Sequence, residues 1–100
     1  MQPNNPIEIL RVHIWVKGLV QEVGYRAHVE YHSLQIGVLG WVRNIDSDTV
    51  ETVAEGTLEQ IDQFIKMVNT GPRNSRVDET RIVYEPTTGH LKGFTVKNSM

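Results

Sequence analysis

The chain contains no cysteine, so disulfide bonds and thiol chemistry are excluded. It also lacks any run of about 18 apolar residues, the length that a membrane-spanning helix needs. Its 10 Lys and Arg nearly balance 12 Asp and Glu, which gives no strong field toward nucleic acid or an anionic membrane. Because the start MQPNNPIEIL lacks a secretory signal pattern, we expect a cytoplasmic protein with no nucleic-acid partner and no membrane partner.

The remaining composition is typical of one folded domain. A chain of 100 residues with 39% hydrophobic and 22% charged residues is large enough to bury a modest core without disulfides. Residues 1–6 contain two prolines and two asparagines, so we expect them to be frayed. Residues 7–100 are then predicted to form a single domain.

Alternating apolar and polar residues predict the strands. Between Leu10 and Lys17 the alternation is typical of a strand with one buried and one solvated face. The residues Asp46-Ser47-Asp48, which form turns by hydrogen bonding to their own backbone, separate two β-rich runs and predict a hairpin. The predicted strands cover residues 10–17, 38–45, 49–54, 77–85 and, after the loop 86–89, a short edge strand over 93–97.

Two segments have helical spacing. Residues 25–36 precede Gly37, a typical C-terminal glycine, and predict the first helix. The second begins with a capping box, Thr57-Leu58-Glu59-Gln60, and ends at Gly71-Pro72. Its predicted apolar stripe consists of Leu58, Ile61, Phe64, Ile65 and Val68.

This order of elements predicts the fold class. It is βαββαβ followed by a short extra C-terminal strand. Two βαβ units of this kind form a ferredoxin-like α/β sandwich, in which two helices cover one face of an antiparallel sheet. The same fold carries enzymes, RNA-binding proteins and regulatory modules, so function has to be argued from a site.

The loop GLVQEVGYR between the first strand and the first helix is the strongest candidate site. A helix N-terminus presents backbone amides without partners, and its dipole favours negative charge. Gly18 and Gly24 allow the loop to turn its amides inward, and Arg26 adds a permanently charged donor, a combination that suits a phosphate. The same residues also fit an ordinary tight turn followed by a solvated arginine.

The motif in this loop resembles the acylphosphatase signature G-x-V-Q-G-V-x-[FY]-R. The stretch Gly40-Trp41-Val42-Arg43-Asn44 resembles the second motif of that family, at the spacing that the family shows. The similarity covers nearly the whole chain. It implies hydrolysis of the carboxyl-phosphate mixed anhydride of an acyl phosphate to a carboxylate and inorganic phosphate.

The resemblance also implies roles for individual residues. Arg26 corresponds to the phosphate-binding arginine of the family, and Asn44 corresponds to the asparagine that positions water; these two are the expected catalytic residues. The implied phosphate-binding loop consists of Gly18, Leu19, Val20, Gln21, Glu22, Val23, Gly24, Tyr25 and Arg26.

A carboxylate leaves readily, so positioning and electrostatics are enough for this reaction. We expect no metal and no cofactor, and we expect inorganic phosphate or sulfate to compete with the acyl phosphate. The protein is expected to act as a monomer.

Two positions depart from the family pattern. Glu22 replaces the central glycine of the first motif, and Asp48 replaces a glycine that follows the asparagine of the second. A carboxylate at position 22 adds negative potential beside the phosphate, and a left-handed backbone there costs a non-glycine residue about 1 to 2 kcal/mol. The alternative function is therefore a weakly active or inactive module of the same fold that binds an anion or a protein partner.

Charged side chains elsewhere suggest weaker hypotheses. His28 and His32 have the helical spacing of metal ligands but no HExxH pattern, and exposed or partly packed histidines are the simpler interpretation. Asp46 and Asp48 could form a carboxylate pair, although their place in a hairpin favours a turn. Glu51 and Glu55 are expected to be strand positions that face solvent.

Aromatic side chains suggest RNA binding as a further alternative. Trp15 and Trp41 could form an aromatic platform, but the apolar neighbours of Trp41 favour a core position. Lys92-Gly93-Phe94 faintly resembles an RNA-recognition peptide, which would belong on an internal strand with paired aromatics. Here it falls on the last strand, which argues against that role.

Overall fold

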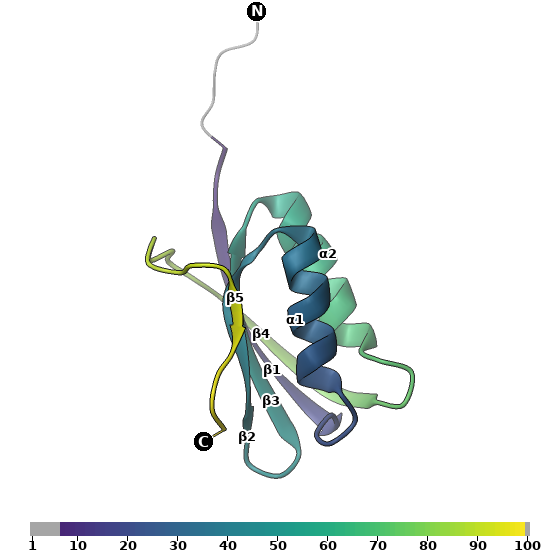
Figure 1. Ribbon diagram of the computed structural model, residues 1–100. Coiled ribbons are helices and arrows are strands. Elements are labelled where there is room, and N and C mark those ends of the chain that lie inside the picture. Colours follow the sequence, from purple (N-terminus) through teal and green to yellow (C-terminus); the bar gives the residue numbers. More distant parts are fainter. Residues whose placement is uncertain (1–6, 100) are drawn as a thin grey trace, which may run out of the picture.

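Two helices cover one face of a five-stranded sheet (Figure 1). The computed structural model describes residues 7–99, so the segment 1–6, expected to be frayed, and Met100 lie outside the described residues. The elements are β1 (Leu10–Leu19), α1 (Tyr25–Ile36), β2 (Leu39–Ile45), β3 (Thr49–Gly56), α2 (Leu58–Thr70), β4 (Arg76–Glu85) and β5 (Phe94–Val96). This order confirms the predicted ferredoxin-like sandwich with an added C-terminal strand.

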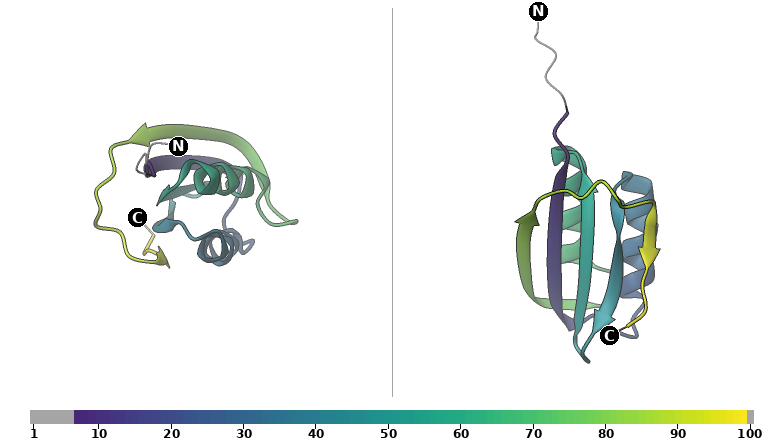
Figure 2. Two further views of the ribbon diagram at one scale, coloured as in Figure 1. Left: turned by 90° about the horizontal axis from the view of Figure 1, so that it is seen from above. Right: turned by 90° about the vertical axis from the view of Figure 1, so that its left-hand side faces the viewer.

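The sheet has the strand order β4-β1-β3-β2-β5. The pairs β1–β3, β1–β4 and β2–β3 are antiparallel, but β5 runs parallel to β2, so the sheet is mixed and not purely antiparallel. Strands β4 and β5 lie at opposite edges, and the chain between them crosses the end of the sheet (Figure 2). A short loop after β4 therefore does not make a hairpin with the last strand.

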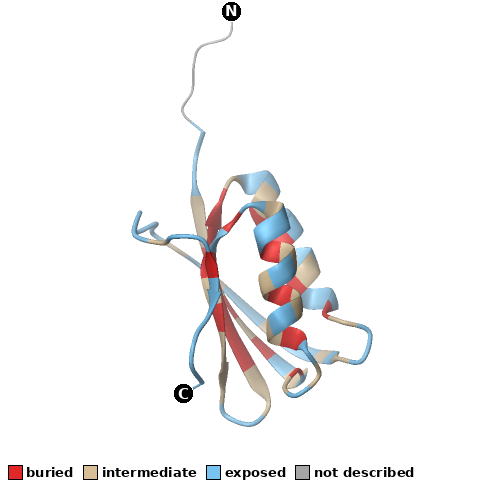
Figure 3. Cartoon of the chain, in the orientation of Figure 1, coloured by how far each residue is buried: buried red, intermediate tan, exposed pale blue. Residues whose placement is uncertain are grey.

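The core lies between the sheet and the helices, where the buried residues gather (Figure 3). Val12, Ile14 and Val16 point into it from β1 and are fully buried, as their alternation predicts. Phe64 and Ile61 on α2 meet them from the other layer. Each such buried side chain stabilises the fold by about 1.5 to 3 kcal/mol. Leu58, placed in the apolar stripe, is instead 59% exposed because it occupies the first turn of α2, beyond the core.

The two helices begin differently. At the start of α2, the Thr57 hydroxyl accepts a hydrogen bond from the Gln60 amide and the Gln60 side chain accepts one from the Thr57 amide, which confirms the capping box. Helix α1 begins after Gly24 with no side-chain cap and no acidic residue in its first turn. The N-terminus of α1 is thus left without the internal partners that α2 has.

Neither helix covers the other face of the sheet (Figure 1), where side chains from neighbouring strands and, at Glu55, the backbone amide of Thr88 surround the carboxylates. Glu51 and Glu55, expected to face solvent, are only 6% and 5% exposed. They do lie on the face away from the helices, but Arg11 bonds to Glu55 at 2.8 Å and Arg43 bonds to Glu51 at 2.7 Å. Long neighbouring side chains bury these carboxylates. Trp41, expected in the core, also lies half-buried on this face, because it pairs across the strands with Val53, which is buried but does not belong to the core cluster between the sheet and the helices.

Candidate active site

The loop between β1 and α1 leaves the sheet at Gly18. The pairing of β1 with β4 shifts by a bulge between Lys17 and Gly18, and Gly18 has a φ of 147°. A Cβ at this position would overlap the carbonyl oxygen of Arg76, so only glycine fits the approach of the two strands. The Gly18 amide donates to Asp48 in the β2–β3 turn at 3.0 Å, which turns the loop toward that hairpin.

Gln21 fastens this loop to the hairpin. Its side-chain nitrogen lies 3.2 Å from the carbonyl oxygen of Ile45, 2.8 Å from that of Asp46 and 2.9 Å from that of Thr49. The sequence motif predicts Gln21 as part of the loop but does not predict this role. The only local signal is an amide side chain, since the three acceptors are more than 20 residues away.

Backbone amides at the start of α1 are free of acceptors. Among residues 7–99, no hydrogen bond is made by a backbone amide between Gln21 and Arg26. Gly24 adopts the left-handed conformation with φ 77°, which bends the chain into the helix. Unpaired amides and the positive end of the helix dipole together favour a bound anion.

Arg26 lines a pocket of about 260 Å³ at this helix terminus. Within the described part of the chain its guanidinium makes no hydrogen bond and no ion pair, so it is free to grip an anion. The other lining residues are Val20, Glu22, Gly24, Tyr25, Ala27, Glu30 and, from β5, Val96. Glu30 and Val96 were not foreseen, although Glu30 follows Arg26 by one helical turn.

The remaining loop residues divide between support and surface. Val20 is buried in the core, Val23 packs partly against it and Leu19 is exposed. Tyr25 turns its ring inward, and its hydroxyl donates to the Val68 carbonyl at 2.6 Å. Burial raises the pKa of the Tyr25 phenol. Tyr25 thereby ties the start of α1 to the end of α2, while its backbone remains part of the loop.

Glu22 occupies the strained position that a glycine would relieve. Its φ is 60°, in the left-handed region, and its side chain is exposed. Such a backbone costs a non-glycine residue about 1 to 2 kcal/mol. The carboxylate lines the same pocket as Arg26 without an ion pair in the described chain, so it adds negative potential there.

Asn44 lies in β2, where it pairs across the strands with Val50, a buried core residue of β3. Its side-chain oxygen is buried and has no hydrogen-bond partner among residues 7–99. Buried polar atoms are almost always paired, so an unpaired one marks a place where a water or a ligand can bind. Ile45, the next residue, accepts the bond from Gln21, which brings the Asn44 end of β2 beside the loop.

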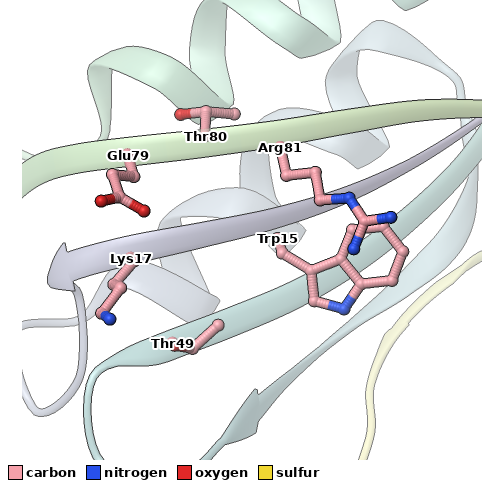
Figure 4. Close-up of a pocket in the computed structure, with 6 residues that line it drawn as sticks. All are labelled: Trp15, Lys17, Thr49, Glu79, Thr80 and Arg81. Carbon is pink, nitrogen blue, oxygen red and sulfur yellow. The ribbon is translucent and has the colours of Figure 1, made fainter.

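A second pocket lies on the open face of the sheet, lined by Trp15, Lys17, Thr49, Glu79, Thr80 and Arg81 (Figure 4). Its cations already have partners, since Lys17 lies 3.9 Å from Asp48 and the Arg81 guanidinium lies 5.1 Å from the centre of the Trp15 ring. The Trp15 ring also stacks on His13 at 3.9 Å. This pocket therefore offers an anion less than the loop does.

The other aromatic residues considered for RNA are also occupied. Lys97 and Arg43 lie over the Trp41 ring, at 4.4 and 5.1 Å from its centre. Phe94 is buried and packs near Phe64, with ring centres 6.0 Å apart. The chain's own side chains thus take the ring surfaces that base stacking would need.

The histidine and aspartate pairs also take local roles. His28 and His32 have ring centres 4.4 Å apart; burial, and then the charge of His32, lower the pKa of His28. No group of three or more potential metal ligands is found among residues 7–99. Asp46 has a left-handed φ of 54° in the hairpin turn, and Asp48 bonds to Thr49 beside it. Both aspartates serve the turn, as favoured above.

Similarity to known proteins extends over most of the chain. A family model described as acylphosphatase matches residues 12–96. Curated acylphosphatases of Roseiflexus sp. (strain RS-1) and Aeropyrum pernix are 32% and 38% identical over 90 residues, which cover 90% and 89% of this chain and 97% and 89% of theirs. A crystal structure of acylphosphatase from Bacillus subtilis has a TM-score of 0.84 at 30% identity, covering 88% of this chain and 98% of that one.

The fold and the loop define a ferredoxin-like sandwich in which α1 begins without a side-chain cap, beside Arg26, whose guanidinium has no partner among the described residues. The match of the family model over most of the chain then shows that this chain belongs to the acylphosphatase family, hydrolases that act on acid anhydrides. The resemblance inferred from two short motifs is confirmed. Neither helix of the described chain is long and apolar enough to span a membrane.

Proposed function

We propose that the protein hydrolyses acyl phosphates with Arg26 and the 18–26 loop as the phosphate site. The observation that carries the proposal is the contrast between the helices: α2 has a full capping box, whereas α1 has none, and within residues 7–99 its first amides and the nearby Arg26 guanidinium have no partner. A phosphate would supply the missing acceptors. Hydrogen bonds to a charged group contribute about 1.5 to 3 kcal/mol each, and these contributions are not additive.

In the proposed reaction, Asn44 orients a water in line with the bond to be broken. The water oxygen bonds to phosphorus, the bond from phosphorus to the acyl oxygen breaks, and the carboxylate leaves with the electron pair. The water protons go to the phosphate product and to solvent. The neutral amide of Asn44 can both accept and donate, so it holds water without repelling the phosphate. Its buried, unpartnered oxygen supports this role.

No metal or cofactor takes part in this scheme, because a carboxylate needs no strong acid to leave. All of the named groups come from one chain, so we propose that a monomer is competent. The test is hydrolysis of benzoyl phosphate by the purified protein, with inorganic phosphate and sulfate as competing anions. Turnover with competitive inhibition by both anions is expected.

Glu22 favours a second candidate, a weakly active or inactive module that binds anions. Its exposed carboxylate lines the pocket from a strained backbone. In the same assay, phosphate binding without turnover would identify this second function. The absence of both turnover and phosphate binding would contradict both candidates.

A further inference from the structure

The pocket at the N-terminus of α1 carries charges of both signs. Arg26 lines it together with two carboxylates, Glu22 from the loop and Glu30 from the next turn of the helix. The remaining walls are largely apolar and include Ala27 and Val96. A site that binds a phosphate alone has no need of carboxylates, so their presence calls for a physical reason.

Within residues 7–99, the carboxylates of Glu22 and Glu30 form no ion pair with Arg26. Arg26 and Glu30 are four residues apart on α1, a spacing that favours an ion pair. Neither Glu30 nor Glu22 forms an ion pair or a side-chain hydrogen bond within residues 7–99. Within the described part of the chain, the pocket therefore holds one cation and two anions that have no ion-pair partner.

The unpaired groups match a ligand with the opposite pattern of charge. A phosphate end would meet Arg26 and the loop amides that have no acceptor among residues 7–99. A positive group on the acyl part of the ligand would be attracted by the carboxylates of Glu22 and Glu30, which line the same pocket and would otherwise only repel the phosphate. The carbon skeleton between them would lie against Ala27 and Val96.

We propose that the pocket selects acyl phosphates whose acyl part carries a positive charge, such as an ammonium group. This selectivity rests on the proposed function, because the phosphate end is placed by the same Arg26 site. Glu22 and Glu30 are specificity residues in this scheme. Hydrolysis of such a substrate gives inorganic phosphate and a carboxylate that still bears its cation.

The experiment compares two substrates of the same shape in the presence of EDTA. One is 4-(trimethylammoniomethyl)benzoyl phosphate, whose acyl part is cationic, and the other is 4-neopentylbenzoyl phosphate, whose acyl part is uncharged. The measured quantity is the ratio of kcat/KM for the cationic substrate to that for the neutral one. The ratio is compared among the unaltered protein, Glu22→Gln, Glu30→Gln and the double variant, so differences in intrinsic reactivity cancel. Asp62→Asn, an exposed carboxylate on α2, is the matched control.

We expect the ratio to fall about three- to tenfold in the double variant, the size expected for exposed charge pairs, and to stay constant in Asp62→Asn. Added salt should lower the ratio of the unaltered protein. Glu30→Gln lies on a regular helix and keeps the test valid even if the loop variant does not fold. Hydrolysis of both substrates with a ratio unmoved by any variant would overturn the selectivity and leave the proposed function intact. If the protein hydrolyses neither of these substrates nor acetyl phosphate, both the selectivity and the proposed function are overturned.

Discussion

The side-chain amide of Gln21 donates to the carbonyl oxygen of Ile45 across 3.2 Å, and Ile45 directly follows Asn44 in β2. One side chain therefore holds the loop that leads to Arg26 against the strand that carries Asn44. Two further acceptors, the carbonyls of Asp46 and Thr49, keep the amide in place. The proposed phosphate and water sites come from segments far apart in the sequence, and Gln21 joins them.

Replacing Gln21 should loosen that link. We expect Gln21→Ala to lower kcat/KM for benzoyl phosphate about tenfold or more and to weaken phosphate inhibition, because the loop loses its anchor. The free energy of unfolding should fall by about 1 to 2 kcal/mol, since the exchanged hydrogen bonds contribute modestly. Steady-state kinetics and urea unfolding provide the measurements, with Gln63→Ala on the exposed side of α2 as control. Unchanged kinetics in Gln21→Ala would show that the loop holds its shape without this side chain.

Arg26→Lys keeps the positive charge of Arg26 but removes the planar fork that can hold two phosphate oxygens. We expect at least a 100-fold loss of kcat/KM and a clear loss of phosphate affinity, with the far-ultraviolet circular dichroism unchanged. Arg73→Lys, at an exposed residue of the 72–75 loop, is the matched control and should behave like the unaltered protein. Near-normal turnover in Arg26→Lys would assign the phosphate to other groups.

Asn44 is assigned to the water and not to the phosphate, so its loss should affect turnover more than binding. Asn44→Ala should lower kcat about 100-fold or more, by analogy with deletion of one positioned donor, while phosphate inhibition changes little. Asn74→Ala, at an exposed loop position, serves as control. Normal kcat combined with lost phosphate inhibition would reverse the assignment.

Local patterns in the sequence account for much of this fold but not for what lies over the sheet. The alternation in β1 gave the correct buried face, and the capping box gave the start of α2. Alternation tells which face a residue occupies, not what covers it, so Glu51 was wrongly expected in solvent. Its burial depends on Arg43 and His13, which come from two other strands.

The sequence likewise predicts some residues of the candidate site but not the contacts that distant strands make there. Arg26 and Asn44 could be proposed because short motifs contain them. The anchoring acceptors of Gln21 and the place of Val96 in the pocket depend on strand pairing across the whole chain. Local sequence carries little information about such distant partners, and the parallel pairing of β5 with β2 was missed for the same reason.

The carboxylates on the open face should make stability depend on pH. Burial acts to raise the pKa of Glu51, but hydrogen bonds with His13 and Arg43 outweigh it and lower this pKa below its usual value. The pKa of Glu85 is lowered mainly by its hydrogen bond with His13, and that of Glu55 is lowered by Arg11 and Thr88 against the effect of burial.

Because these pKa values are lower in the folded state, the unfolded chain binds more protons as pH falls below about 4.5. The stability that the carboxylates contribute is therefore present at neutral pH and is lost progressively below that value. We expect Glu51→Gln to lower the free energy of unfolding at pH 7 by roughly 1 to 3 kcal/mol and to flatten its fall between pH 5 and about pH 3. Urea unfolding across pH measures both, with Asp62→Asn as control. An unaltered slope in Glu51→Gln would show that Glu51 does not contribute to the pH dependence of stability.

Glu22 combines a strained backbone with an unfavourable charge, and Glu22→Gly removes both. The strain at a left-handed φ of 60° is worth about 1 to 2 kcal/mol, and the added freedom of glycine in the unfolded chain offsets about 0.4 to 1 kcal/mol of it. A net stabilisation of about 0.5 to 1 kcal/mol is expected, whereas Glu22→Gln keeps the strain and should leave stability nearly unchanged. Urea unfolding of the two variants therefore separates strain from charge.

For an acyl phosphate whose acyl part is uncharged, both Glu22→Gly and Glu22→Gln should raise kcat/KM. At a separation of about 8 Å and an effective dielectric of about 40 to 80, one carboxylate opposes each unit of phosphate charge by roughly 0.5 to 1 kcal/mol. Removing it should improve kcat/KM several-fold, and the gain should shrink as ionic strength rises because salt screens exposed charges. An inactive parent rescued by Glu22→Gly would favour the anion-binding module. If the parent is active and either variant hydrolyses benzoyl phosphate more slowly at every salt concentration, the Glu22 carboxylate assists the reaction, and its repulsion of the phosphate does not govern the site.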